Sequence, residues 1–251
     1  MTISFPELLR EMRRVVEAAR ERNICLRAIG GVAIRFHCQN LPLALEREYQ
    51  DIDFVVEPIE YPKLKTFFES IEYVPNKRFN LLNDARRQIY YYKDTDRHVD
   101  VFVGDFEMCH KLPMSSRLRL DPITVSLADL FLSKAQIVKL NRKDALDLLS
   151  LLFCNEIGSD DEKRVNAAYI ANLCANDWGL WKTVSINLER IKEILRAEDI
   201  QLSDEQRSLL SNRISEIERA IARAPKSLAW QLRDRVGTRV RWYTEVEEVE
   251  Q

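Results

Sequence analysis

The sequence predicts an α+β protein in which a mixed sheet flanked by helices is followed by a helical C-terminal region. Seven of the eight prolines lie at or before Pro122, and only Pro225 follows them. Short apolar runs typical of strands alternate with amphipathic segments in the first half, whereas helical spacing of apolar residues dominates beyond Ser126. We therefore expect an α/β domain over residues 1–125 and a helical domain over residues 126–251.

A helix, a strand and a second helix are expected first. Residues 6–22 carry apolar side chains at helical spacing among Glu and Arg, which predicts an amphipathic helix. The apolar run 24–29 ends at Gly30 and Gly31, which is typical of a strand that enters a tight turn. Residues 32–38 then continue as a second helix.

The next segment supplies the remaining strands. They are recognised by short apolar runs bounded by turn residues, and two of them are close enough along the chain to form a hairpin. Strands are expected over residues 51–56, 87–93, 98–103 and 118–125, with a helix over 61–70 and a hairpin turn over 93–97.

Helices are expected over most of the second half. Ser126 is a suitable N-cap, with Asp129 three residues later as a partner of the capping-box kind. Asn141 can cap the following helix, whose apolar residues run to Phe153. The acidic tail 245–251 is expected to fray. Further helices are predicted over roughly 160–175, 180–197, 204–223 and 227–236.

Composition limits the functional classes. The net charge of -2 and the pI of about 6.1 do not favour nucleic-acid binding through bulk charge. The N-terminus has no basic segment followed by an apolar core, and no apolar stretch is long enough to span a bilayer, so we expect a cytoplasmic protein with no membrane partner. Five cysteines without a CxxC pair fit neither a disulfide framework nor a zinc ribbon.

Three aspartates form the sharpest chemical signal. Asp51 and Asp53 are two residues apart in a strand, so they point to one face with Cα atoms about 7 Å apart. Asp100 is a single carboxylate within the apolar strand 98–103. Hard carboxylate oxygens suit Mg²⁺ or Mn²⁺, so the three are candidate metal ligands and catalytic groups. The alternative is that they are surface carboxylates, with Asp100 an edge-strand charge.

Gly30 and Gly31 strengthen that signal. Only six glycines occur in the chain, and these two are adjacent between a predicted strand and a predicted helix. Glycine at such a turn lets backbone N–H groups approach a phosphate closely. The alternative is a plain turn, because neither the P-loop nor the dinucleotide-binding pattern occurs in this sequence.

These motifs, taken in order, resemble the polymerase-beta nucleotidyltransferase superfamily. In that superfamily a glycine pair or Gly-Ser precedes a strand with two aspartates, and a third carboxylate lies on a later strand. A second block, Lys134 followed by the segment 142–147 with Asp144 and Asp147, resembles the branch of abortive-infection type IV toxins and related small nucleotidyltransferases. The resemblance covers about residues 24–150. The clear third carboxylate favours the small-molecule transferases, which include lincosamide- and aminoglycoside-modifying enzymes.

The resemblance implies an enzyme with a mixed sheet of the nucleotidyltransferase type. It would transfer an NMP from an NTP, ATP by preference, to a hydroxyl acceptor, with magnesium or manganese as cofactor and release of pyrophosphate. The acceptor is a small molecule, RNA or protein, with a small molecule favoured over RNA, and a homodimer or an antitoxin partner stays open. The implied catalytic and metal residues are Asp51, Asp53 and Asp100, and the implied nucleotide-binding residues are Gly30, Gly31, Arg47, Lys134 and Asp144.

Each nucleotide-binding residue outside the glycine turn also has a simpler interpretation. Arg47 would be an exposed loop arginine, Lys134 could extend along an apolar surface towards water, and Asp144 is favoured by its position at a helix N-terminus. A non-catalytic nucleotide-binding or toxin-antitoxin module is the alternative function, and a helical interaction protein is a third. The segment 230–243 mixes arginines with aromatic residues, which suits either RNA or, as we favour, a helix with packed tryptophans.

Overall fold

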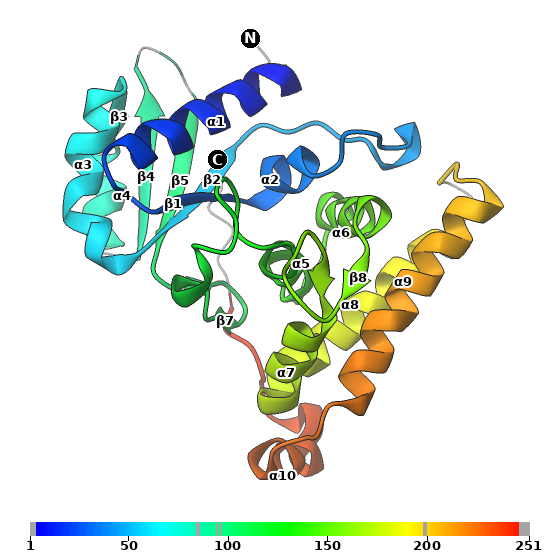
Figure 1. Cartoon of the computed structure of the whole chain (residues 1–251). Helices are drawn as coiled ribbons and strands as arrows, with labels where there is room; N and C mark the ends of the chain where they lie inside the picture. Colours follow the sequence, from blue (N-terminus) through cyan, green and yellow to red (C-terminus); the bar gives the residue numbers. More distant parts are fainter. Residues whose placement is uncertain (1–3, 84–85, 94, 96, 198–199, 246–251) are drawn as a thin grey trace. The chain divides into compact units, whose positions relative to one another are not determined.

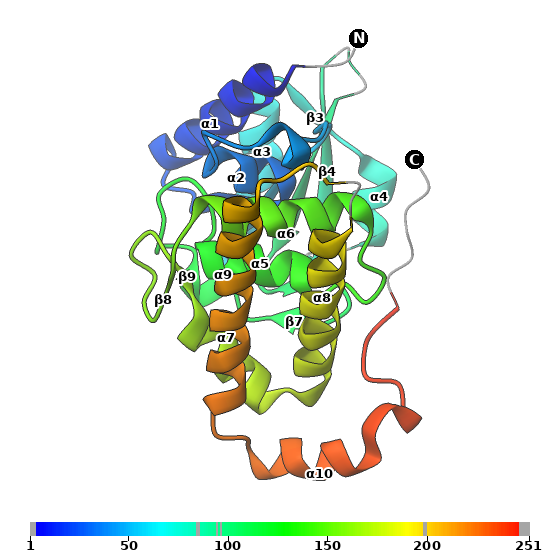
Figure 2. The same ribbon diagram turned by 90° about the vertical axis from the view of Figure 1, so that its right-hand side faces the viewer.

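The computed structural model describes residues 4–83, 86–93, 95, 97–197 and 200–245, and it divides into two compact units. The first unit comprises Met1–Phe36, Glu48–Phe106 and Leu112–Ser126, and the second comprises His37–Arg47, Glu107–Lys111 and Leu127–Gln251. The first holds a mixed sheet with helices and the second is mainly helical (Figures 1 and 2). The predicted α+β class is confirmed.

The first unit is built on a five-stranded sheet of order β1-β2-β5-β4-β3. Strands β2 and β5 are parallel, and the other neighbours are antiparallel, so the sheet is mixed as expected. The predicted hairpin is confirmed by the antiparallel pairing of β4 with β5, although part of its turn lies outside the described residues. The strands are β1 (Leu26–Ile29), β2 (Ile52–Val56), β3 (Tyr73–Pro75), β4 (Arg87–Tyr92) and β5 (His98–Val103).

The strand expected over residues 118–125 is wrong. This segment makes only a single bridge, between Thr124 and Ala28 of β1. The Asp121 carboxylate accepts hydrogen bonds from the backbone N–H groups of Ile123 and Thr124, both at 2.8 Å. Such a local side-chain contact curves the backbone and competes with regular strand pairing.

One face of the sheet is a hydrophobic core, and the opposite face carries the aspartates. Helix α1 (Phe5–Glu21) buries its apolar side, and α3 (Tyr61–Ser70) contributes Phe68, which stacks on Tyr90 of β4 with 4.2 Å between ring centroids. Because side chains alternate along a strand, Ile89 points away from Tyr90, and its cross-strand partner Asp100 shares that opposite face. This unit also contains α2 (Gly30–Phe36) and α4 (Lys77–Leu82), and a small two-stranded pair is formed by β6 (Phe106–Glu107) and β7 (Lys111–Leu112).

The second unit consists of helices and one small pair of strands. The helix predicted over 160–175 is wrong in its first part, because Asn166 caps a helix that begins only at Ala167. The Asn166 side chain accepts from the N–H of Tyr169 at 2.9 Å, and β8 (Ile157–Gly158) pairs with β9 (Val165–Asn166) just before it. The helices are α5 (Leu127–Ala135), α6 (Arg142–Cys154), α7 (Ala167–Asn176), α8 (Trp178–Arg196), α9 (Asp204–Arg223) and α10 (Leu228–Val236).

Side chains of α8 and α9 hold the ends of α5 and α6. The Asn187 amide donates to the carbonyls of Ala135 and Ile137 at 2.9 and 2.8 Å, and Arg213 donates to the carbonyls of Leu152 and Phe153 at 2.8 and 2.6 Å. These contacts satisfy carbonyl groups that a helix leaves free at its C-terminus. The prediction that Asn141 caps α6 is confirmed, because its Oδ1 accepts from the N–H of Asp144 at 2.8 Å.

The tryptophans of the segment 230–243 are packed within the second unit. Trp230 is 9% exposed and meets Trp181 edge-on, with 4.9 Å between ring centroids. The Trp242 indole N–H donates to the Thr183 hydroxyl at 3.0 Å. These contacts support the interpretation of a helix with packed tryptophans. Most of the tail expected to fray, residues 246–251, lies outside the described residues.

Among the described helices, none combines the length and apolar character that a membrane span requires.

Candidate functional site

Asp53 and Asp100 lie directly opposite each other on the two parallel strands β2 and β5. Neighbouring strands are about 4.8 Å apart, and side chains at paired positions share one face of the sheet. Like charges in directly opposite positions repel, so this arrangement is unfavourable unless a cation is nearby. Asp51 precedes β2, which begins at Ile52 and not at residue 51 as expected, and its side chain is 39% exposed. We call Asp51, Asp53 and Asp100 the aspartate face.

Two basic side chains of the same unit contact the aspartate face. The Arg87 guanidinium donates from Nε to Asp100 Oδ1 at 2.7 Å. It lies over the rings of Phe79 and Phe102, at 5.6 and 5.2 Å from their centroids. The His98 Nε2 atom is 3.7 Å from Asp100 Oδ2 and 3.9 Å from Asp51 Oδ1. Asp100, which is 4% exposed, is therefore held by a strong contact on one carboxylate oxygen.

The glycine turn lies against the aspartate face. Ile29, the last residue of β1, pairs with Asp53, so Gly30 follows directly beside this carboxylate. Gly30 has φ of 80°, and a Cβ atom at this position would lie 2.3 Å from Asp53 Oδ2. Helix α2 begins at Gly30 itself, two residues earlier than predicted. Glycine is thus required both by the backbone conformation and by the close approach of Asp53.

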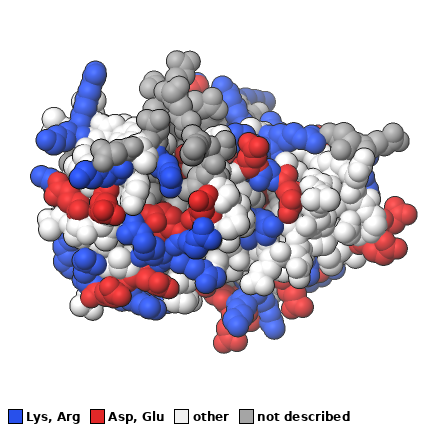
Figure 3. All heavy atoms as spheres, turned by 90° about the horizontal axis from the view of Figure 1, so that it is seen from above, with Lys and Arg blue, Asp and Glu red and all other residues white. Residues whose placement is uncertain are grey.

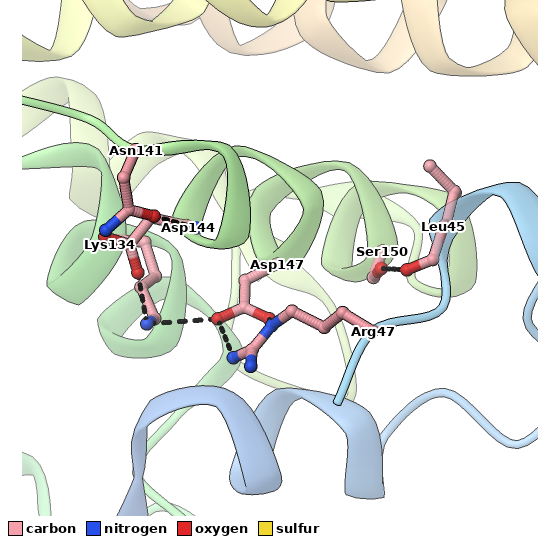
Figure 4. Close-up of polar contacts among 7 residues, drawn as sticks. All are labelled: Leu45, Arg47, Lys134, Asn141, Asp144, Asp147 and Ser150. Carbon is pink, nitrogen blue, oxygen red and sulfur yellow. Dashed lines mark hydrogen bonds and ion pairs between the residues drawn. The ribbon is translucent and has the colours of Figure 1, made fainter. Parts of the chain in front are cut away.

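The other predicted residues form a cluster within the second unit (Figure 4). Asp147 accepts from Arg47 through Nε and Nη2, both at 2.7 Å, and lies 3.0 Å from Lys134 Nζ. Lys134 also donates to Asp144 Oδ1 at 2.6 Å. We call Arg47, Lys134, Asp144 and Asp147 the ion-pair network. The alternative interpretation of Arg47 as an exposed loop arginine is wrong, because its side chain is only 15% exposed.

The network is buried and electrically matched. The Asp147 side chain is fully buried, and those of Lys134 and Asp144 are 16% and 17% exposed. Burial alone would lower the pKa of Lys134, but the Asp147 and Asp144 carboxylates outweigh it and raise this pKa above its ordinary value. The lysine is therefore positively charged at every physiological pH.

The aspartate face fits a hard divalent cation by the chemistry of its donors. Its oxygens are carboxylates, and the opposed pair Asp53 and Asp100 gains from a cation between them. Within the described ranges, however, no group of three or more His, Cys, Asp and Glu side chains is already arranged around one metal position.

Two residues of the site were missed by the sequence analysis as functional candidates. Arg87 shares the face of Asp100 because it lies two residues before Ile89, the cross-strand partner of Asp100. That relation depends on the register of β4 with β5. Asp147 could have been identified from its spacing to Asp144. Residues three apart on a helix are neighbours, so both carboxylates were expected on the same side of α6.

Comparisons with known proteins were made for the whole chain. No protein-family model matches it, and a search of curated proteins gave no match. Among solved structures, the antibiotic-resistance factor ANT(2'')-Ia is similar with a TM-score of 0.44 and 14% identity, covering 68% of this chain and 96% of that chain. An antigenic nucleotidyltransferase-like protein from Paracoccidioides brasiliensis has a TM-score of 0.41 and 13% identity, covering 89% and 96%.

The STING-associated CdnE c-di-GMP synthase from Capnocytophaga granulosa has a TM-score of 0.21 and 15% identity, covering 84% of this chain and 82% of that chain. Because these TM-scores are below 0.5, the similarities carry no argument about function. The function proposed for this chain therefore depends on its own residues.

Proposed function

We propose that this chain is a nucleotidyltransferase that transfers a nucleoside monophosphate from an NTP, ATP by preference, to the hydroxyl group of an acceptor. The observation that carries the proposal is the direct opposition of Asp53 and Asp100 beside the glycine turn at Gly30. Two buried or half-buried carboxylates and a close backbone turn are the groups that a metal-bound triphosphate requires. Arg87 offsets part of the charge of Asp100, and a cation between the two carboxylates would further reduce the repulsion between them.

In the proposed reaction, the acceptor oxygen attacks the α-phosphorus of the NTP. The bond from the α-phosphorus to the oxygen that bridges to the β-phosphate breaks, and pyrophosphate leaves. Asp100 accepts the proton of the acceptor hydroxyl, and the Arg87 contact on Oδ1 fixes the orientation of that carboxylate. A divalent cation held by Asp51, Asp53 and Asp100 would supply charge neutralisation at the reacting phosphate and lower the pKa of the hydroxyl.

The triphosphate is assigned to backbone N–H groups and to cations. The N–H groups of Gly30 and Gly31 approach phosphate oxygens, and Arg47 and Lys134 neutralise the negative charge of the β- and γ-phosphates, with Asp144 as the partner of Lys134.

A small molecule is favoured as the acceptor over RNA. The aromatic residues of 230–243 that could stack bases contact other aromatic rings or Thr183. On the face drawn in Figure 3, basic and acidic side chains are interspersed and do not form one broad basic patch. A strand of RNA is usually bound through a continuous basic surface.

The test is incubation of the chain with α-labelled NTPs, Mg²⁺ and a cell lysate, followed by separation of the labelled products. Transfer predicts one labelled acceptor class and release of pyrophosphate, both abolished in Asp53→Ala. A matched control is Asp204→Ala, which removes an exposed carboxylate at the start of α9. Magnesium-dependent NTP binding without any labelled product would support the non-catalytic module instead.

A further inference from the structure

Asp147 is a charged residue at a position where the helix would otherwise be apolar. Its side chain is fully buried on α6, between the buried residues Leu146 and Leu148. It accepts three contacts, two from Arg47 at 2.7 Å and one from Lys134 at 3.0 Å (Figure 4). A buried carboxylate is strongly unfavourable without such partners, and an apolar residue of similar size often gives equal stability. The charge at this position therefore needs a role beyond stability.

Asp147 is the residue on which the two cations meet. Arg47 precedes β2 and Lys134 lies in the last turn of α5, so they approach from distant parts of the sequence. Asp144, by contrast, forms its ion pair with Lys134. The contact with Arg47 uses the planar fork of the guanidinium against both carboxylate oxygens, which fixes direction as well as distance. Asp147 thus sets the separation and the orientation of both positive groups.

The segment that carries Arg47 is attached to α6 at further points. Leu45 is fully buried, and its carbonyl accepts from the Ser150 hydroxyl at 3.4 Å. The Cys38 thiol donates to the Ser150 carbonyl at 3.1 Å. Because Ser150 lies one turn beyond Asp147 on α6, the backbone of this segment is held independently of the ion pair. Loss of the Asp147 charge would therefore weaken the two contacts on the Arg47 guanidinium and leave the backbone attachments of this segment in place.

We propose that Asp147 is a positioning residue that holds Arg47 and Lys134 as one preorganised pair for the triphosphate of the nucleotide. This inference rests on the proposed function, in which both cations contact phosphate. Two fixed cations bind a polyphosphate better than two mobile ones, because less side-chain freedom is lost on binding. The alternative is that Asp147 competes with phosphate for the two cations. In that case Asp147 would weaken phosphate binding, and removal of its charge would strengthen phosphate binding.

The test compares Asp147→Asn with the wild-type chain in calorimetric titrations with a non-hydrolysable ATP analogue and Mg²⁺. Asparagine keeps the shape and one acceptor oxygen but removes the charge. We expect binding at least about 10-fold weaker, with the KM for NTP raised to a similar extent and kcat at saturation within about 3-fold. Glu218→Gln is the matched control, because it removes the charge of one of the carboxylates that pair with Lys192 in the same unit and should leave affinity unchanged.

Arg47→Lys is a second variant, which keeps the positive charge but loses the planar guanidinium fork. It should show the same loss of affinity for the ATP analogue. This variant tests the proposal if Asp147→Asn does not fold. Combining the two changes should add little to either one, because both remove the same contact. Unchanged or tighter binding in Asp147→Asn, with a wild-type chain that binds the analogue, would overturn the positioning role alone. A wild-type chain that does not bind the analogue would overturn the proposed function and this inference together.

Discussion

The aspartate face and the ion-pair network differ in how their charges are balanced. In the network, two cations meet two carboxylates at distances between 2.6 and 3.0 Å, and the central carboxylate is fully buried. In the aspartate face, the Arg87 guanidinium contacts Asp100 at 2.7 Å, and the contacts of His98 with Asp100 and Asp51 are longer, at 3.7 and 3.9 Å. The network pairs cations with carboxylates within the protein, whereas under the proposed function the aspartate face would gain a cation supplied with the substrate.

This difference separates two ways in which a protein uses charge. A matched and buried network fixes side chains in one geometry, and breaking it costs stability. An excess of negative charge at a sheet position lowers the stability of the fold when no cation is bound, but it creates affinity for cations. Substitutions in the aspartate face should therefore lower activity with little loss of stability. Truncations in the network should mainly lower the stability of the fold.

The largest effect is expected for Asp53→Ala. It removes a carboxylate that faces Asp100, so the variant should lose turnover by about 10³-fold or more, since metal-assisted charge stabilisation contributes several kcal/mol. Its thermal midpoint should be equal to or above that of the wild type, because a repulsive pair is relieved. Pyrophosphate release and circular dichroism measure the two quantities. Wild-type turnover in Asp53→Ala would contradict the assignment of the aspartate face.

Asp147→Ala should have the opposite profile. It leaves Arg47 and Lys134 without their shared carboxylate, and loss of one partner in a buried network costs about 3–5 kcal/mol. Urea denaturation of this variant measures the loss. Glu218→Ala serves as the comparison, because its partly exposed pair with Lys192 is expected to contribute about 0–1 kcal/mol. Equal losses in the two variants would show that the network is not the stable element described above.

The predictability of the two regions from the sequence also differs. The alternation of Asp51, Ile52 and Asp53 is a local signal, and it was sufficient to predict a strand, although the strand begins at Ile52 and includes only Asp53 of the two carboxylates. The contact between Arg47 and Asp147 joins residues a hundred positions apart, and no local pattern distinguishes such an arginine from one in an exposed loop.

The same limit explains the errors in secondary structure. The segments 118–125 and 160–166 were assigned from their composition, as a strand and as the start of a helix. Local hydrogen bonds decide both: Asp121 curves the first segment, and Asn166 bonds to Asp161 at 3.1 Å while it caps α7. Side chains that bond their own backbone compete with regular structure, and their choice depends on the surrounding fold.

Gly30→Ala tests how closely the glycine turn is fitted to the aspartate face. Its left-handed backbone should cost about 1–2 kcal/mol, and the new Cβ at 2.3 Å should displace the Asp53 carboxylate by roughly 1 Å, enough to lower turnover by about 10²-fold. Gly237→Ala is the matched control, because Gly237 has φ of 60° with nothing within 4 Å. It should lose similar stability without loss of turnover. Equal activity in the two variants would contradict the close fit.

The smallest effect is expected from His110, which lies in the second unit outside the ion-pair network. Burial lowers the pKa of His110, with Asp177 opposing the shift, and its Nε2 lies 2.9 Å from the Thr183 hydroxyl. As the pH falls below about 6.5, the unfolded chain binds a proton that the folded chain refuses, so stability decreases towards acid. The slope from this one group is at most about 1.4 kcal/mol per pH unit. Urea denaturation between pH 7 and 5 should show a shallower slope in His110→Gln, and the same slope in both proteins would exclude this histidine as a source of acid sensitivity.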